Sequence, residues 1–286
     1  MNSRTVLRAM TALYLLIFFG YLFGPLMIMA ASAFNSDSYP TAYPIESLTL
    51  KWFWVLLTDR DMMLGLKNSV IIGIGVVCVS VPVGLAGSIM MTQIYPRARS
   101  LYYLITVSPV LTPGVIIGIS TVIFWKDFSE LTGTKPYIYN GIILAILGQS
   151  SFISAYSMLI IMARLTRFDR AQEEAALDLG ASYPQVFWHI LLPFLKPALL
   201  SAAVIAFLSS FENYNTTTFA ILADKTLVTV IAGKVRQGTT PALSALGVII
   251  ILITLVGAVA YEYLKRREEA ASAQRLREEG GAAAEG

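Results

Sequence analysis

Residues 173–193 read EEAALDLGASYPQVFWHILLP, and this stretch lies between two long apolar segments of the chain. It begins with charged and Ala residues, is interrupted once by Gly180 and closes at Pro193. Charged side chains at this density are costly in lipid, so we expect the stretch to lie outside the bilayer. It forms the centre of a loop over residues 166–196, which we interpret as two short helices joined at the glycine.

Helix start and stop signals divide this loop into its two parts. Asp169 can cap a first helix over 170–179, and Gly180 suits the left-handed residue that ends such a helix. Ser182 can cap a second helix, which we expect to end at Pro193 because proline cannot continue an interior turn. The apolar side chains of the second helix need a protein partner, because an exposed apolar surface is otherwise a liability.

The composition indicates a membrane protein. Of the 286 residues, 56% are hydrophobic and 14% are charged, whereas soluble domains carry about 25% charged residues. Several apolar segments reach about 20 residues, the length that crosses a bilayer as a helix. Backbone polar groups in lipid must be bonded internally, so the spans should be helices and the fold class is predicted to be an all-α integral membrane protein.

Six transmembrane helices are expected in a single domain over 1–265, followed by a cytoplasmic tail over 266–286 that we expect to be disordered at its end. The approximate spans are 9–33, 68–92, 100–125, 140–163, 197–222 and 243–264. Prolines within these spans should bend them without ending them, because neighbouring helices can satisfy the freed carbonyls. Lys and Arg are more frequent in the loops and ends on the side of both termini, so this side is predicted to be cytoplasmic.

The loop carries a specific spacing of Glu-Ala-Ala, three residues, Gly, nine residues and then Ile-x-Leu-Pro. The matching positions are Glu174, Ala175, Ala176, Gly180, Ile190, Leu192 and Pro193. This spacing resembles the signature loop of the inner-membrane permease subunits of binding-protein-dependent ABC importers. The six-span layout is similar to the same family, which implies the type I ABC importer permease fold.

The resemblance implies that the loop forms coupling helices, which dock into a groove on a cytoplasmic ATPase subunit. Glu173 and Asp178 are assigned to the same coupling surface. The implied partners are a second permease subunit, two ATPase subunits, a periplasmic solute-binding protein and the lipid bilayer, without nucleic acid. ATP and Mg²⁺ would be bound by the ATPase subunits, so we expect no cofactor and no metal in this chain. A bacterial inner (plasma) membrane location is implied as well.

The sequence does not indicate an enzyme. The single histidine, His189, lies in the loop, and no acid–His–nucleophile set can form away from it. The sequence contains neither HExxH nor the phosphate loop GxxxxGK(S/T), so the chain should not hydrolyse ATP alone. An ion-gradient-driven secondary carrier is an alternative, because such carriers use intramembrane charges and broken helices.

The intramembrane acid that keeps this alternative open is Glu212, in the fifth span. A continuous helix would place Asn215 and Phe219 on the same side as Glu212. An anion, an amide and aromatic faces together suit an amine-bearing solute through charge and cation–π attraction. The other interpretation is a structural carboxylate that pairs with Lys or Arg of a second subunit. The predicted substrate path comprises Phe211, Glu212, Asn213, Tyr214, Asn215 and Thr218, with Gln149 of the fourth span.

The chain also resembles, more loosely, the spermidine/putrescine branch of these permeases. The supporting stretches are NSVIIGIGVVCVSVPVGLAGSIMM, SPVLTPGVIIGIS and the Ser210-Phe211-Glu212 run, where that branch tends to carry acidic residues. NYNTTTF follows, where a second acid is expected, and this departure leaves the cargo open. The predicted function is an ATP-driven permease subunit that moves a polyamine or other amine-bearing solute from periplasm to cytoplasm by alternating access. An aminophosphonate or a small organic anion is the alternative cargo.

Overall fold

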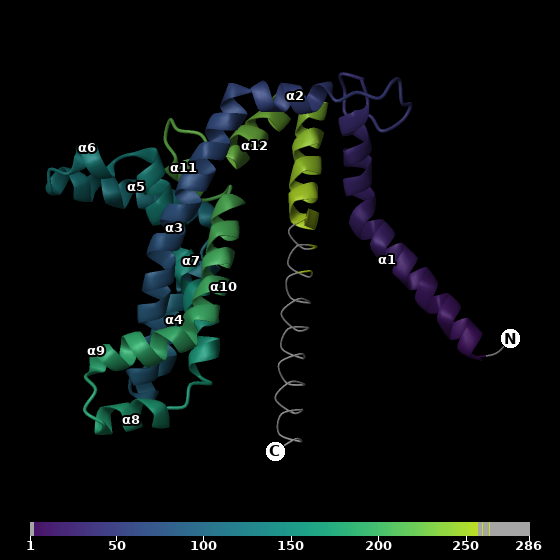
Figure 1. The fold of residues 1–286 in the computed structure, drawn as a ribbon. Coiled ribbons are helices and arrows are strands. Elements are labelled where there is room, and N and C mark those ends of the chain that lie inside the picture. The colour runs from purple at the N-terminus through teal and green to yellow at the C-terminus, as the bar shows by residue number, and fades with distance from the viewer. Residues whose placement is uncertain (1–2, 257–258, 260–262, 264–286) are drawn as a thin grey trace, which may run out of the picture. The chain divides into compact units, whose positions relative to one another are not determined.

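The computed structural model describes residues 3–256, 259 and 263, and Figure 1 shows that helices dominate this part of the chain. The chain divides into two compact units. The central unit is Arg60–Gly233, and the terminal unit combines Met1–Asp59 with Lys234–Gly286. The single domain predicted over 1–265 stays a prediction, and the tail predicted over 266–286 lies outside the described residues.

Three long helices form the core of the central unit: α3 (Arg60–Gln93), α7 (Gly141–Leu165) and α10 (Leu192–Phe211). α10 buries a small residue at every fourth position, namely Ala198, Ala202, Ala206 and Ser210. α3 and α7 bury Gly and Ser along their contact as well. Small side chains let helix backbones approach closely, which replaces the hydrophobic driving force that lipid does not supply.

The predicted third span, 100–125, was expected to bend at its prolines, and the structure shows a sharp bend there. The structure has two helices there, α4 (Pro96–Leu111) and α5 (Gly114–Leu131), and they are bent by 100° relative to each other. Thr112 and Pro113 are both extended between them, with ψ of 132° and 130°. A residue before proline is pushed away from helical geometry, and here two extended residues in series turn the chain. Pro25 and Pro82, in contrast, lie inside continuous helices, as predicted.

Shorter helices connect these elements. α6 (Lys135–Ile138) precedes α7, and α11 (Thr217–Ala220) follows α10. Between α7 and α10 lie α8 (Ala171–Asp178), α9 (Tyr183–Val186) and a π-helical turn at Phe187–Leu191. α12 (Leu227–Gln237) begins in the central unit, and its last residues belong to the terminal unit.

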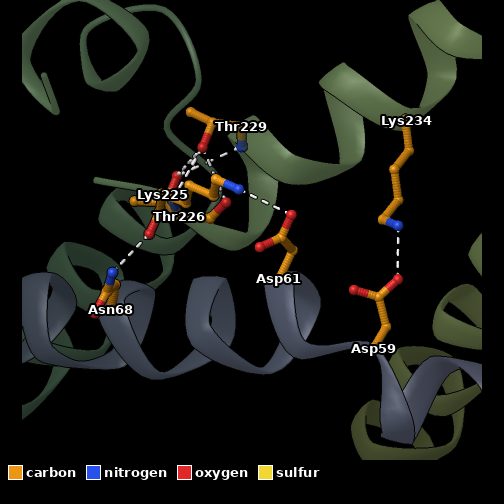
Figure 2. A network of polar contacts seen from close by, with 7 residues as sticks. All are labelled: Asp59, Asp61, Asn68, Lys225, Thr226, Thr229 and Lys234. Atoms are coloured by element: carbon orange, nitrogen blue, oxygen red, sulfur yellow. Dashed lines mark hydrogen bonds and ion pairs between the residues drawn. The ribbon is translucent and has the colours of Figure 1, made fainter. Parts of the chain in front are cut away.

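Polar contacts fasten the segment after α11 to the first turns of α3, as Figure 2 shows. The amide of Asn68 donates to the carbonyl of Lys225 over 2.8 Å, and Lys225 Nζ pairs with Asp61 at 2.8 Å. Gly65 permits this approach, because a Cβ there would lie 3.0 Å from backbone atoms of Thr226 and Leu227. The path of the chain from α11 into α12 is therefore fixed against α3.

The terminal unit contains α1 (Ser3–Phe34), α2 (Lys51–Thr58) and an apolar helix at Pro241–Val256. Ala33, Trp52, Ala245 and Val248 form its buried cluster. The hydroxyl of Ser32 donates to that of Ser244 over 2.9 Å. Within this unit Lys234 Nζ also pairs with Asp59 at 2.6 Å.

The number of spans agrees in part with the six that were predicted. Among the described residues, four helices are long and apolar enough to cross a membrane, or five if the bent α4–α5 pair is one span. The remaining candidate, predicted over 243–264, corresponds in part to Pro241–Val256, and residues 257–264 lie largely outside the described residues. The count of six stays a prediction.

The close contact between α3 and α7 predicts a large effect from one methyl group. At Gly84 a Cβ would lie 2.6 Å from Ser157 Cβ and 2.7 Å from the backbone nitrogen of Met158. Gly84→Ala should destabilise the folded chain by about 1–3 kcal/mol through overpacking, which thermal unfolding in detergent can measure. Gly20→Ala on α1 is the matched control, because nothing lies within 4 Å of that position. Equal unfolding temperatures of the two variants would contradict the packing argument.

Candidate functional site

The first helix of the loop over 166–196 forms as predicted. It is α8, Ala171–Asp178, against the expected 170–179. Asp169 Oδ1 accepts from the backbone N–H of Ala171 over 3.0 Å and so caps its start. Gly180 ends it with φ of +88°, a conformation that costs Gly little and other residues more.

The second helix begins as predicted but does not end at Pro193. The N–H of Ser182 donates to Gln185 Oε1 over 2.7 Å at the start of α9. After α9 the chain winds as a π-helix and passes into α10, so that Pro193 is the second residue of that helix. An α-helical proline ring clashes with the carbonyl four residues earlier. The wider π-turn before Pro193, with Leu192 N–H bonded to the carbonyl of Phe187, accounts for the continuation.

The loop presents an apolar surface that no described part of the chain covers. Within residues 171–178 no side chain is buried. Leu179 is 90% exposed at the joint between the helices, and Tyr183 and Trp188 are also largely exposed. A groove of about 410 Å³ runs along this joint and is lined by Leu179, Gly180, Ala181, Gln185, Val186, His189 and Ile190. An exposed apolar surface of this kind is typical of an interaction site.

The predicted coupling residues occupy three places in this loop. Glu173, Glu174, Ala175, Ala176 and Asp178 lie on α8, and Leu192 and Pro193 begin α10. Gly180 and Ile190 are the two that line the groove. Glu174 and Ala175 are exposed, and Ala176 is half-buried. Leu179 and Tyr183, which the spacing did not single out, are the most exposed apolar side chains of the loop.

The fifth span is interrupted, and the prediction of a continuous helix over 197–222 is wrong. α10 ends at Phe211 and α11 begins at Thr217. Asn213 Oδ1 accepts from the backbone N–H groups of Thr216 and Thr217, at 3.1 and 3.3 Å, and from the Thr217 hydroxyl. Asn side chains offer the backbone an alternative to helical bonds. Asn215 and Phe219 therefore do not share a helix face with Glu212.

The interrupted segment forms one wall of a pocket of about 360 Å³. Its lining residues are Phe152, Tyr156, Ile205, Ser209, Glu212, Asn213, Tyr214 and Asn215. The structure thus brings together four of the predicted path residues, Glu212 to Asn215. It adds the Phe152 and Tyr156 rings of α7, which sequence reasoning missed, although their spacing of four residues in a span places both on one helix face.

The electrostatics of this pocket favour a cation. Within the described chain Glu212 is the only charged residue that lines it, and Glu212 takes part in none of the ion pairs found there. The carboxylate lies at the carboxyl end of α10, where the helix dipole is negative. Three aromatic rings complete the lining, and aromatic faces attract cations.

Gln149, Phe211 and Thr218 do not line the pocket. Gln149 is fully buried, and both ends of its amide are bonded: Nε2 donates to the Thr217 hydroxyl over 2.7 Å, and Oε1 accepts from the Ser210 hydroxyl. It therefore joins α7 to both sides of the interruption. Gln149 was predicted to lie on the substrate path, but the structure buries its side chain fully and away from the pocket.

Glycines of α5 let that helix lie directly against the interruption. A Cβ on Gly118 would lie 2.6 Å from the carbonyl oxygen of Thr216, and one on Gly114 would lie 3.0 Å from Asn215 Cβ. The interruption is thus held on one side by the buried Gln149 and on another by the backbone of α5. Among the residues that the structure describes, no group of three or more His, Cys, Asp or Glu could hold a metal.

The chain is similar to known transport proteins. A family model described as "Binding-protein-dependent transport system inner membrane component" matches residues 84–269. The chain is 27% identical over 283 residues to the putrescine transport system permease protein PotI of Escherichia coli (strain K12), covering 97% of this chain and 98% of that protein. It is 29% identical over 208 residues to the spermidine/putrescine transport system permease protein PotC homolog of Mycoplasma genitalium, covering 71% of this chain and 70% of that one.

Among solved structures, a bacterial ABC transporter involved in the import of the acidic polysaccharide alginate contains a similar chain. The TM-score is 0.67, with 16% sequence identity, and the match covers 93% of this chain and 96% of that chain. At this identity the similarity shows a shared fold and nothing about the cargo.

The capping role of Asn213 gives a prediction for the interruption of the fifth span. Asn213→Ala removes the acceptor of three hydrogen bonds and should lower the free energy of unfolding by about 1–2 kcal/mol, as losing a helix cap does. Asn213→Asp keeps an acceptor at the same place and should retain most of that stability. Thermal unfolding of both variants in detergent checks this, and equal destabilisation by Ala and Asp would refute the capping role.

Proposed function

Because this chain belongs to the family of binding-protein-dependent transport system inner membrane components, we propose that it imports a polyamine or a related amine-bearing solute with energy supplied by partner ATPase subunits. The chain is a permease subunit of an ABC importer and a multi-pass membrane protein. The expected fold class, an all-α membrane protein with the type I ABC importer permease fold, is confirmed by the family and the shared fold.

The observation that carries the cargo assignment is the pocket beside the interrupted fifth span. An ammonium group that enters it meets the Glu212 carboxylate, the carboxyl end of α10 and the rings of Phe152, Tyr156 and Tyr214. Each ring over a cation contributes about 0.5–2 kcal/mol, depending on desolvation. The volume of about 360 Å³ lies at the lower end of the range of about 300–1,000 Å³ for ligand pockets, which suits a small solute.

The names of the relatives support the same cargo. PotI is named as part of a putrescine transport system, and the Mycoplasma protein as part of a spermidine/putrescine system. An aminophosphonate or a small organic anion would bring negative charge to the Glu212 carboxylate, which disfavours that alternative. Family membership favours an ATP-driven importer over an ion-gradient-driven carrier.

The partners follow from the loop surface. The exposed groove at the joint of α8 and α9 would receive an ATPase subunit, with Glu174 and Ala175 exposed beside it. Two ATPase subunits, a second permease subunit and a periplasmic solute-binding protein complete the proposed assembly. ATP and Mg²⁺ would be bound by the ATPase subunits, because this sequence has no phosphate loop.

The proposed orientation places the loop and both termini in the cytoplasm of a bacterium, with the chain in the inner membrane. The excess of Lys and Arg on that side supports this orientation. Alternating access would then expose the Glu212 pocket first to the solute-binding protein and later to the cytoplasm. α10 reaches from the loop to the pocket, so movement of the loop would be passed to the Glu212 end of that helix.

The charge of Glu212 is tested with putrescine uptake by the reconstituted transporter. Glu212→Gln should raise the apparent KM for putrescine about tenfold, which corresponds to about 1.4 kcal/mol of lost charge interaction. Glu212→Asp should keep most of the uptake. Glu130→Gln is the control, because Glu130 lies on α5, pairs with Lys135 of α6 and does not line the pocket. If Glu212→Gln takes up putrescine as the unmodified protein does, the cargo assignment is wrong, although the membership of the importer family still holds.

The joint at Gly180 is tested by a matched pair of glycines. Gly180 has φ of +88° and Gly133, after α5, has φ of +68°, and an added Cβ would meet nothing within 4 Å at either position. Alanine at each should cost about 1–2 kcal/mol of backbone strain. Gly180→Ala should also reduce the amount of ATPase subunit that co-purifies, because it reorients α8 against α9, whereas Gly133→Ala should not. Equal co-purification with both variants would argue against docking at this joint.

A further inference from the structure

The two ends of the loop over 166–196 meet at a contact between Arg164 and Phe194. Arg164 lies in the last turn of α7, and Phe194 in the first turn of α10. Arg164 Nε donates to the carbonyl oxygen of Phe194 over 2.7 Å. The same guanidinium lies over the Phe194 ring, 4.6 Å from its centroid. One side chain thus holds both the backbone and the ring of a residue 30 positions away.

Further contacts at this point make the base of the loop compact. The Phe168 ring, just beyond α7, lies 5.1 Å from the Phe194 ring. Beneath them Ile161, Leu195 and Ala202 are fully buried together. The guanidinium takes part in none of the ion pairs found in the described chain, so its charge is directed at the carbonyl and the ring. Charged hydrogen bonds of this kind are roughly twice as strong as neutral ones.

The chain beside this contact is intrinsically weak as a helix. Residues Phe187–Leu191 form a π-turn, which interrupts the regular ladder of hydrogen bonds. Pro193 and Pro197 have no N–H, so the carbonyls of His189 and Pro193 lack an α-helical donor. A helix with a π-turn and two prolines within eleven residues, Phe187 to Pro197, can bend there. Without a contact that holds this segment, force applied to α8 and α9 would be absorbed by bending between Phe187 and Pro197.

We propose that Arg164 is a positioning residue that stiffens the segment Phe187–Pro197, so that movement of the proposed coupling helices α8 and α9 is passed to α7 and α10 together. This inference rests on the proposed function, because it assumes that an ATPase moves the loop. Arg164 touches neither the pocket nor the groove. Its role is to keep α10 in line with the loop at one end, so that the other end, at Glu212, moves when the loop moves.

The test compares uptake with ATP hydrolysis in the complete transporter reconstituted in vesicles with its ATPase subunits, second permease and solute-binding protein. Arg164→Gln removes the charge and the stacking over Phe194. The number of putrescine molecules taken up per ATP hydrolysed should fall about tenfold, the factor expected for one charged hydrogen bond. ATP hydrolysis itself should stay within about twofold, and ATPase subunits should still co-purify. A residue that served folding alone would lower assembly and leave this ratio unchanged.

Two further variants complete the test. Arg167→Gln is the control, because Arg167 lies three residues further along the same connection and is exposed; its ratio should match the unmodified protein. Arg164→Lys keeps the charge but lacks the planar group that stacks and donates from Nε, so its ratio should be intermediate. If Arg164→Gln does not assemble, the Lys variant decides. A wild-type ratio in every Arg164 variant that assembles overturns the inference. Absence of ATP-dependent uptake by the unmodified protein would instead overturn the proposed function.

Discussion

The absence of water inside a bilayer is the constraint on which this structure depends, because a backbone N–H or C=O group left without a partner there costs several kcal/mol. The interruption of the fifth span is possible because side chains replace the lost helical bonds. Asn213 accepts from two backbone N–H groups, and the buried Gln149 links Ser210 to Thr217 across the interruption. The Glu212 pocket lies beside this interruption, where side-chain hydrogen bonds take the place of the helical ones.

α10 connects the loop over 166–196 to the Glu212 pocket. One end of this helix of 20 residues, which spans about 30 Å, follows the π-turn of the loop, and the other end carries Glu212. Beyond Leu195 at the loop end, its buried face consists only of small residues, Ala198, Ala202, Ala206 and Ser210. A smooth helix held at its ends is suited to transmit displacement between a loop and a pocket, which a helix locked by large side chains would resist.

Much of the structure of the loop over 166–196 could be predicted from the sequence, whereas less of the pocket could. α8 begins and ends within one residue of its expected bounds, because a capping Asp and a left-handed Gly act locally. The end of a helix at Pro193 and the continuous fifth span were wrong, whereas the third span bends at its prolines, though by as much as 100°. These arguments assume a regular α-helix. A local π-turn instead carries the chain through Pro193, and Asn213 with the buried Gln149 of α7 replaces the helical bonds at the interruption of the fifth span.

The sequence by itself determined the class of the protein, its all-α character and the place of the loop, because hydropathy, charge and a spaced motif are properties of the chain alone. It also determined that the carboxylate of Glu212 lies in an apolar segment. Only the tertiary structure decided what surrounds that carboxylate. Phe152 and Tyr156 line the pocket, Gln149 bonds Ser210 and Thr217 across the interruption, and Arg164 bonds the carbonyl of Phe194. These contacts form because helices distant in sequence pack together at small residues. The identity of a neighbour depends on that packing and cannot be read from local order.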